Sequence, residues 1–145
     1  MQKVPFDKIL FLDIETVPQF YQFDELPDEG KKLYDAKTKM LQKEKSVEEV
    51  YDRAGIYAEF GKIVCISVGF LQIKQGEPMV FRTKSFANKD EQKLLQDFST
   101  MLDQFYGNPS NSYICGHNIK EFDIPYTCRR MLINGVALPN LHRML

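Results

Sequence analysis

Short apolar segments separated by turn-like residues predict a β-sheet in this chain. Residues 9–12 and 63–71 are mainly apolar at consecutive positions, which is typical of central strands covered on both faces of a sheet. Residues 79–82 predict a third strand, joined to the second through the turn-like residues 74–78. A short fourth strand is expected at residues 113–115.

Apolar residues at helical spacing predict two helices in the second half of the chain. Asn88 and Glu91 have the spacing of a capping box that opens the first helix. The expected apolar stripe of this helix consists of Leu94, Leu95, Phe98, Leu102 and Phe105. The second helix is expected to begin near Pro125, a residue favoured in the first turn, and to end at Asn134 and Gly135. The resulting order of elements predicts an α/β domain with a mixed sheet flanked by helices.

The segment between the first two strands is unusually charged. Residues 24–53 hold 16 of the chain's 39 Asp, Glu, Lys and Arg residues, and we expect a helical insertion over residues 24–55. Ser46 and Glu49 resemble a second capping box. The expected apolar stripe of the insertion consists of Leu33, Met40, Leu41, Val47, Val50 and Tyr51. In one interpretation this segment packs on the domain and exposes its charged face to solvent. In the other it is a movable cover over a site beside the first strand. The first interpretation is favoured.

Length and charge restrict the protein class. A chain of 145 residues is long enough for one domain with a core, and we expect a single domain over residues 1–145; no apolar stretch reaches the length of a membrane span. We expect a cytoplasmic location. The net charge of −1 supplies no broad basic surface for nucleic acid, so a long-groove DNA binder is disfavoured. The three cysteines, Cys65, Cys115 and Cys128, form no disulfide or zinc pattern and are expected to be small core residues.

Two acidic residues follow the first apolar segment directly. Asp13 and Glu15 are spaced i, i+2, so on a strand their side chains project from the same face, with Cα atoms roughly 6.6 Å apart. Paired carboxylates at a buried strand are costly to desolvate unless a positive group lies between them. A hard divalent cation such as Mg²⁺ prefers such oxygen ligands, and Asp123 is a third candidate ligand.

Each of these residues has a simpler interpretation. Asp13 and Glu15 could begin a loop, since short D-x-E sequences often occur by chance. Asp123 lies just before Pro125, so it could cap a helix N-terminus. Phe122 and Tyr126 are more often core residues than substrate platforms. The metal-site interpretation therefore depends on all three carboxylates occurring together in this order.

Two segments of the chain resemble known exonuclease motifs. Residues 11–16, FLDIET, are similar to the first motif of the DEDD-type 3′–5′ exonucleases, which have an RNase H-like fold. Residues 118–126, NIKEFDIPY, are similar to their second motif in the form found in the proofreading domain of family B DNA polymerases and in stand-alone bacterial relatives. Residues 60–67 resemble the segment that forms the second strand in that group. The resemblance covers nearly the whole chain except the charged insertion.

The resemblance implies an activity and a set of roles. Asp13 would be the bridging ligand of a two-metal site for Mg²⁺ or Mn²⁺, with Glu15 and Asp123 as further catalytic carboxylates. Thr16 would lie against the terminal nucleotide, and Asn118 and Phe122 would position the strand. The expected reaction removes nucleoside 5′-monophosphates one at a time from the 3′ end of single-stranded DNA, as in proofreading or repair.

The chain departs from the family pattern at its C-terminal end. The third motif of the family supplies a fourth carboxylate and a Tyr or His that orients the attacking water, but the 22 residues after Asp123 contain no acidic residue. We therefore expect an incomplete domain that lacks the last strand and helix of the fold, with a weakly held second metal. Neither His117 nor His142 is assigned as the catalytic base.

Other functions remain open from the sequence. A nuclease-like domain without the fourth carboxylate could bind nucleic-acid 3′ ends without cutting them. An RNA-trimming exonuclease would share the same motifs, because no residue can be assigned to contact the 2′-hydroxyl. An unfinished sheet edge could also pair with a second copy to form a homodimer.

Overall fold

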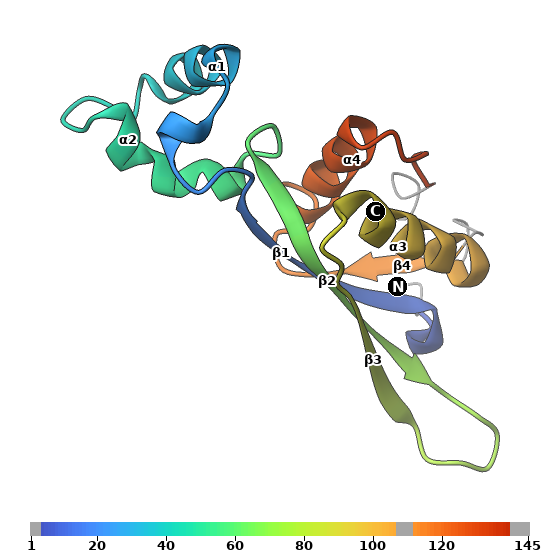
Figure 1. Ribbon diagram of the computed structural model, residues 1–145. Helices are drawn as coiled ribbons and strands as arrows, with labels where there is room; N and C mark the ends of the chain where they lie inside the picture. The colour runs from blue at the N-terminus through green and yellow to red at the C-terminus, as the bar shows by residue number, and fades with distance from the viewer. Residues whose placement is uncertain (1–3, 107–111, 140–145) are drawn as a thin grey trace. The chain divides into compact units, whose positions relative to one another are not determined.

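The computed structural model describes residues 4–106 and 112–139, and Figure 1 shows the path of the chain. The chain divides into two compact units. The sheet unit consists of Met1–Glu15 together with Val64–Leu145, and the helical unit consists of Thr16–Ile63. Each unit is described by itself.

A four-stranded mixed sheet organises the sheet unit, as the sequence predicts. Its strands are β1 (Ile9–Pro18), β2 (Gly61–Gln72), β3 (Val80–Phe86) and β4 (Tyr113–Cys115), in the order β3-β2-β1-β4. β1 and β4 run parallel, while β2 and β3 are antiparallel neighbours. This mixed sheet with its helices is consistent with an RNase H-like fold.

β1 is longer than its apolar run suggests. The apolar run covers residues 9–12, but the strand continues to Pro18, so Asp13 and Glu15 lie on it as expected and the alternative that they begin a loop is wrong. Its side chains alternate from Leu10 to Glu15: Leu10, Leu12 and Ile14 are buried, whereas Asp13 and Glu15 are exposed. The two-residue period of the strand thus places both carboxylates on the face that is not buried.

α3 (Glu91–Tyr106) has the predicted apolar stripe, but its N-terminus differs from the prediction. Leu94, Leu95, Phe98 and Leu102 are buried as predicted, but the prediction is wrong for Phe105, which is 73% exposed. Asp90, not Asn88, caps the helix, because its Oδ1 accepts hydrogen bonds from the backbone N–H groups of Gln92 and Lys93. Glu91 is therefore the first helical residue, and its side chain is directed elsewhere, as described below.

α4 (Asp123–Ile133) follows β4, and its start and end agree with the sequence signals. Pro125 lies in the first turn, where its missing N–H leaves no helical hydrogen bond unmade. Asn134 ends the helix and Gly135 follows with φ of 66°, a left-handed conformation that glycine adopts without strain.

The helical unit has a small aromatic core of its own. It contains the short 3-10 helices η2 (Phe23–Glu25) and η3 (Tyr51–Ile56), α1 (Asp28–Thr38) and α2 (Val47–Val50). Its buried cluster comprises Leu26, Tyr34, Tyr51, Ala54 and Phe60. The capping box of Ser46 and Glu49 is confirmed, since both of its reciprocal hydrogen bonds form.

Part of the predicted apolar stripe in this segment is wrong. Leu33, Met40 and Leu41 are 57%, 81% and 43% exposed, while Tyr34, which the stripe omitted, is fully buried. The helical wheel of α1 turns Tyr34 inward because its ring packs on Tyr51 and Phe60, with centroids 5.1 and 4.9 Å away. Phe23 and Tyr57 also lie against the Tyr34 ring, so four aromatic partners determine the buried face here more than the aliphatic residues do.

The cysteines are not core residues, contrary to the prediction. Cys65 and Cys128 are half-buried, Cys115 is exposed, and all three are free thiols. Cys65 lies in β2, Cys115 in β4 and Cys128 in α4, each at a position that is not fully buried.

Within the described ranges, none of the helices combines the length and the apolar character needed to cross a membrane.

Candidate metal centre

The two candidate carboxylates of β1 are held by the strand itself. Asp13 and Glu15 flank Ile14, whose side chain is 7% exposed and anchors the strand in the core. Both acidic side chains are exposed, so water can solvate them while the backbone that carries them stays fixed.

The third carboxylate reaches β1 through the parallel pairing of β4. Phe11 of β1 lies opposite Cys115 of β4, and the chain then turns at Gly116 into α4. A Cβ at Gly116 would lie 2.5 Å from the Leu12 carbonyl oxygen, so only glycine allows the chain to leave β4 this close to β1. The turn therefore brings Asp123, at the start of α4, next to the strand that carries Asp13.

The turn between β4 and α4 is built by backbone hydrogen bonds. Asn118 has φ of 51°, a left-handed conformation that asparagine tolerates better than most residues. Its carbonyl oxygen accepts from the N–H groups of Glu121 and Phe122, at 3.1 and 3.0 Å. The Ile119 carbonyl oxygen accepts a hydrogen bond from the Ile124 N–H at 3.0 Å, which closes the turn at the start of α4.

Substituting Gly116 tests how tightly this turn is packed. We expect Gly116→Ala to lower the free energy of unfolding by about 1–3 kcal/mol, because the added methyl group meets the Leu12 carbonyl and the Ile119 side chain. Gly30→Ala, in α1, is the matched control: its new Cβ meets neighbours no closer than 3.5 Å, and about 0.5–1 kcal/mol of stabilisation is expected. Urea unfolding followed by tyrosine fluorescence measures both. Equal effects of the two variants would contradict the close approach at Gly116.

Asp123 occupies an environment that disfavours its charge. The side chain is 3% exposed, and this burial is the main reason why the pKa of Asp123 is raised. The negative charge of Asp13 raises the pKa further, which shows that the two carboxylates are within electrostatic reach of each other. The backbone N–H groups of Asp123 and Ile14, and the nearby His117, partly oppose these effects on the pKa.

The structure therefore places two of the three predicted carboxylates, Asp13 and Asp123, within electrostatic reach of each other. Asp13 and Asp123 interact, and Glu15 lies on the same face of β1 as Asp13. Across residues 4–106 and 112–139, no three His, Cys, Asp or Glu side chains gather into a group able to hold a metal ion. The alternative role of Asp123 as an N-cap is wrong, because Phe122 is the N-cap residue and Asp123 already lies inside α4.

The comparison with protein families decides the relationship of this chain. The family model of the DNA polymerase family B exonuclease domain matches residues 34–145. The chain belongs to this family. The matched range includes the whole of the second motif around Asp123, and Asp13 and Glu15 precede it. A search of curated proteins finds no match.

Membership of the exonuclease-domain family supports a 3′–5′ exonuclease type of function that acts on nucleic-acid ends. The carboxylate pair found here agrees with such chemistry. Asp13 and Asp123 present hard oxygen donors, and the burial and mutual repulsion that raise the pKa of Asp123 are relieved when a divalent cation lies between them. The donor chemistry of Asp13 and Asp123 thus suits a divalent cation, while no group of three such ligands gathers within residues 4–106 and 112–139.

The predicted substrate residues of the exonuclease domain lie in the turn before α4 and in β1. Asn118 is exposed in the turn before α4, and the half-buried Phe122 lies against Tyr126, with ring centroids 5.3 Å apart. Tyr126 is a core residue, 2% exposed, as its simpler interpretation predicted. Thr16 continues β1 after Glu15 and is the first residue of the helical unit. His117 is exposed, while His142 lies outside the described residues.

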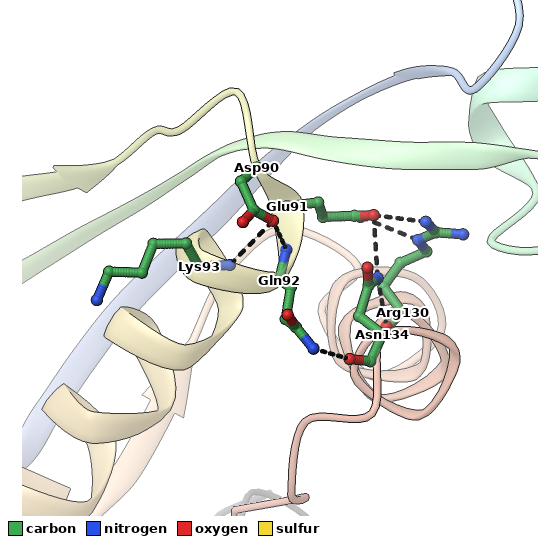
Figure 2. A network of polar contacts seen from close by, with 6 residues as sticks. All are labelled: Asp90, Glu91, Gln92, Lys93, Arg130 and Asn134. Carbon is green, nitrogen blue, oxygen red and sulfur yellow. Dashed lines mark hydrogen bonds and ion pairs between the residues drawn. The ribbon is translucent and has the colours of Figure 1, made fainter.

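The sequence did not predict a buried ion pair that joins α3 and α4. Arg130 of α4 is 3% exposed, and its guanidinium donates to both carboxylate oxygens of Glu91 in α3, as Figure 2 shows. The sequence shows only that Arg130 stands seven residues after Asp123 and so lies on the same face of the helix; no local pattern identifies Glu91 as its partner. The capping-box interpretation had assigned Glu91 another partner.

Proposed function

We propose that this domain removes nucleotides one at a time from the 3′ end of single-stranded DNA, releasing nucleoside 5′-monophosphates. The observation that supports the proposal most is the buried Asp123, held within electrostatic reach of Asp13 in a domain of the proofreading-exonuclease family. Mg²⁺ or Mn²⁺ is the proposed cofactor, since both prefer carboxylate oxygens.

Asp13 and Asp123 would hold the first ion, and Glu15 would complete its ligands or contribute to a more weakly held second one. A divalent ion held there would stabilise the negative charge that develops on the reacting phosphate and would make a water molecule a stronger nucleophile. The residues of the chain do the rest. Burial of Asp123 keeps bulk water from one side of the pair, and the strand backbone of β1 fixes the direction of Asp13.

The turn before α4 is proposed to position the substrate strand. Asn118 presents an exposed amide next to the backbone that leads to Asp123, and Phe122 offers a partly exposed ring. Thr16 would contact the terminal nucleotide from the strand that carries Asp13 and Glu15. These proposed roles follow from the family motifs.

A second candidate function is binding of a 3′ end without hydrolysis. It is favoured by one observation: in the described part of the chain, no three potential ligands gather into a metal-binding group. A carboxylate pair that held one cation would attract a terminal phosphate. No second cation would then stabilise the oxygen of the leaving group, so the phosphate could be bound without being cut.

A labelled single-stranded oligonucleotide distinguishes the candidates. With Mg²⁺ or Mn²⁺ we expect shortening by single nucleotides from the 3′ end, recovery of 5′-monophosphates, and loss of shortening with chelator or with a blocked 3′ terminus. An RNA oligonucleotide of the same sequence measures the preference for the sugar. Metal-dependent binding of the free 3′ end without shortening would support the second candidate. If the protein neither binds nor shortens the oligonucleotide, both candidates are rejected.

A further inference from the structure

The Arg130–Glu91 pair is the centre of a larger polar network between α3 and α4 (Figure 2). Nε of Arg130 donates to Oε1 of Glu91 at 2.9 Å, and Nη2 donates to Oε2, so the pair is bidentate. The side chains of Arg130 and Glu91 are only 3% and 10% exposed. This is a charge pair removed from water, unlike the exposed Lys93–Asp97 pair on the same α3 helix.

Two amide side chains extend the network to the end of α4. Nδ2 of Asn134 donates to Oε2 of Glu91 at 3.0 Å and to the Arg130 carbonyl at 2.8 Å. Nε2 of Gln92 donates to the Asn134 carbonyl at 2.7 Å. The last turn and C-cap of α4 are thereby fixed to the first turn of α3 by directional contacts.

The same face of α4 carries the candidate metal ligand. Asp123, Thr127, Arg130 and Asn134 are spaced i, i+4, i+7 and i+11, which is a single stripe along a helix. α4 is short, with 11 residues, so a rotation or slide at its last turn is transmitted to Asp123. Thr127 between them is fully buried, and its hydroxyl has no hydrogen-bond partner among the described residues, so it does not fix the helix by a polar contact.

A buried ion pair is a weak way to stabilise a fold, because the desolvation of two charges offsets their attraction. Apolar side chains of similar volume often serve stability equally well, whereas a bidentate pair specifies one geometry. We propose that the network of Glu91, Arg130 and Asn134 sets the rotation and height of α4, so that Asp123 faces Asp13. Arg130 and Glu91 are then positioning residues for the metal centre, an inference that rests on the proposed function.

The double variant Glu91→Met with Arg130→Leu tests this inference, with Lys93→Gln and Asp97→Asn together as the matched exposed control. Three measurements are made on each protein: urea unfolding, Mn²⁺ binding by calorimetry, and amide hydrogen exchange without metal. We expect the double variant to unfold at the same urea concentration as the unaltered protein or higher. We expect its Mn²⁺ affinity to fall on the order of tenfold, as with other groups that orient metal ligands indirectly.

The exchange measurement does not depend on any metal. In the double variant, protection of the Ile124 and Tyr126 amides, which bond to the Ile119 and Phe122 carbonyls, should fall about tenfold while β2 amides keep theirs. Arg130→Lys keeps a buried charge without the bidentate geometry and should give an intermediate loss. The control pair should change neither quantity.

The outcomes separate the inference from the proposed function. Unchanged protection of the Ile124 and Tyr126 amides in the double variant would overturn the inference, as would a drop in stability that affects β2 and α4 amides equally. Mn²⁺ bound equally well by the double variant would also overturn it. If the unaltered protein binds no Mn²⁺, the proposed function fails and takes with it the metal-centre role, while the exchange data still decide whether the network orients α4.

Discussion

Replacing Asp123 with Asn is expected to abolish the metal-dependent shortening of DNA without harming the fold. Loss of one ligand of the catalytic ion removes several kcal/mol of charge stabilisation, so the rate should fall on the order of 10³-fold or more. Stability without metal should stay equal or rise. Burial raises the pKa of Asp123, which means that the folded state disfavours its charged form, and a neutral amide carries no such cost.

The measurement compares two variants of the same turn. Glu121→Gln is the control, because Glu121 is exposed and lies only two residues before Asp123. Both proteins are melted with chelator and then with saturating Mg²⁺. We expect a ligand at a hundred times its dissociation constant to add about 2.7 kcal/mol to the unaltered protein and to Glu121→Gln, and little to Asp123→Asn. Equal stabilisation of all three by Mg²⁺ would contradict a metal held by Asp123.

Replacing Tyr34 with Ala is expected to unfold the helical unit under mild conditions. Its ring is fully buried against Tyr51 and Phe60, and its hydroxyl donates to the Val50 carbonyl at 2.9 Å. Burial raises the pKa of Tyr34 to about 12, so the hydroxyl stays a donor at all physiological pH values. The lost contacts and the cavity should cost about 3–5 kcal/mol of the free energy of unfolding.

Leu33→Ala is the control for Tyr34→Ala. Leu33 is the preceding residue of α1 but is 57% exposed, so its removal should change stability by no more than about 0.5 kcal/mol. Amide hydrogen exchange reports the helical unit through the Phe60 and Gly61 amides, which bond to the Tyr57 carbonyl. Protection of these amides should collapse in Tyr34→Ala alone. Loss of the same size in Leu33→Ala would show that the aliphatic stripe, not the aromatic core, holds the unit together.

The elements of the sheet unit were predictable because their signals are local. Apolar runs gave all four strands, and the residues Pro125, Asn134 and Gly135 marked the beginning and end of α4. Strand ends were not predictable. β1 runs through the polar residues Asp13 and Glu15 because pairing with its neighbours, not hydrophobicity, extends the strand.

The failures came from tertiary contacts. Leu33 and Met40 looked like core residues at helical spacing, but the ring of Tyr34 found more partners than either aliphatic side chain. Glu91 was read as part of a capping box because it stands three residues after Asn88, yet Arg130, 39 residues later, takes its carboxylate. No local pattern reports a partner that far along the chain.

The sequence predicted which residues form the candidate site better than it predicted their arrangement and burial. The order of Asp13, Glu15 and Asp123 pointed to one centre, and the interaction of Asp13 with Asp123 agrees with that order. What no spacing could show is that Asp123 is 3% exposed while Asp13 is exposed, because burial depends on how α4 packs. The environment of each carboxylate is therefore a property of the fold.

Paramagnetic broadening by Mn²⁺ tests the central claim most directly. Substoichiometric Mn²⁺ added to the isotope-labelled protein should broaden the amide signals of Asp13, Ile14 and Asp123 first, since relaxation falls steeply with distance from the ion. The same signals should stay sharp in the double variant Asp13→Asn with Asp123→Asn. Broadening confined to other parts of the chain, or identical in the double variant, would contradict a metal centre built on these two carboxylates.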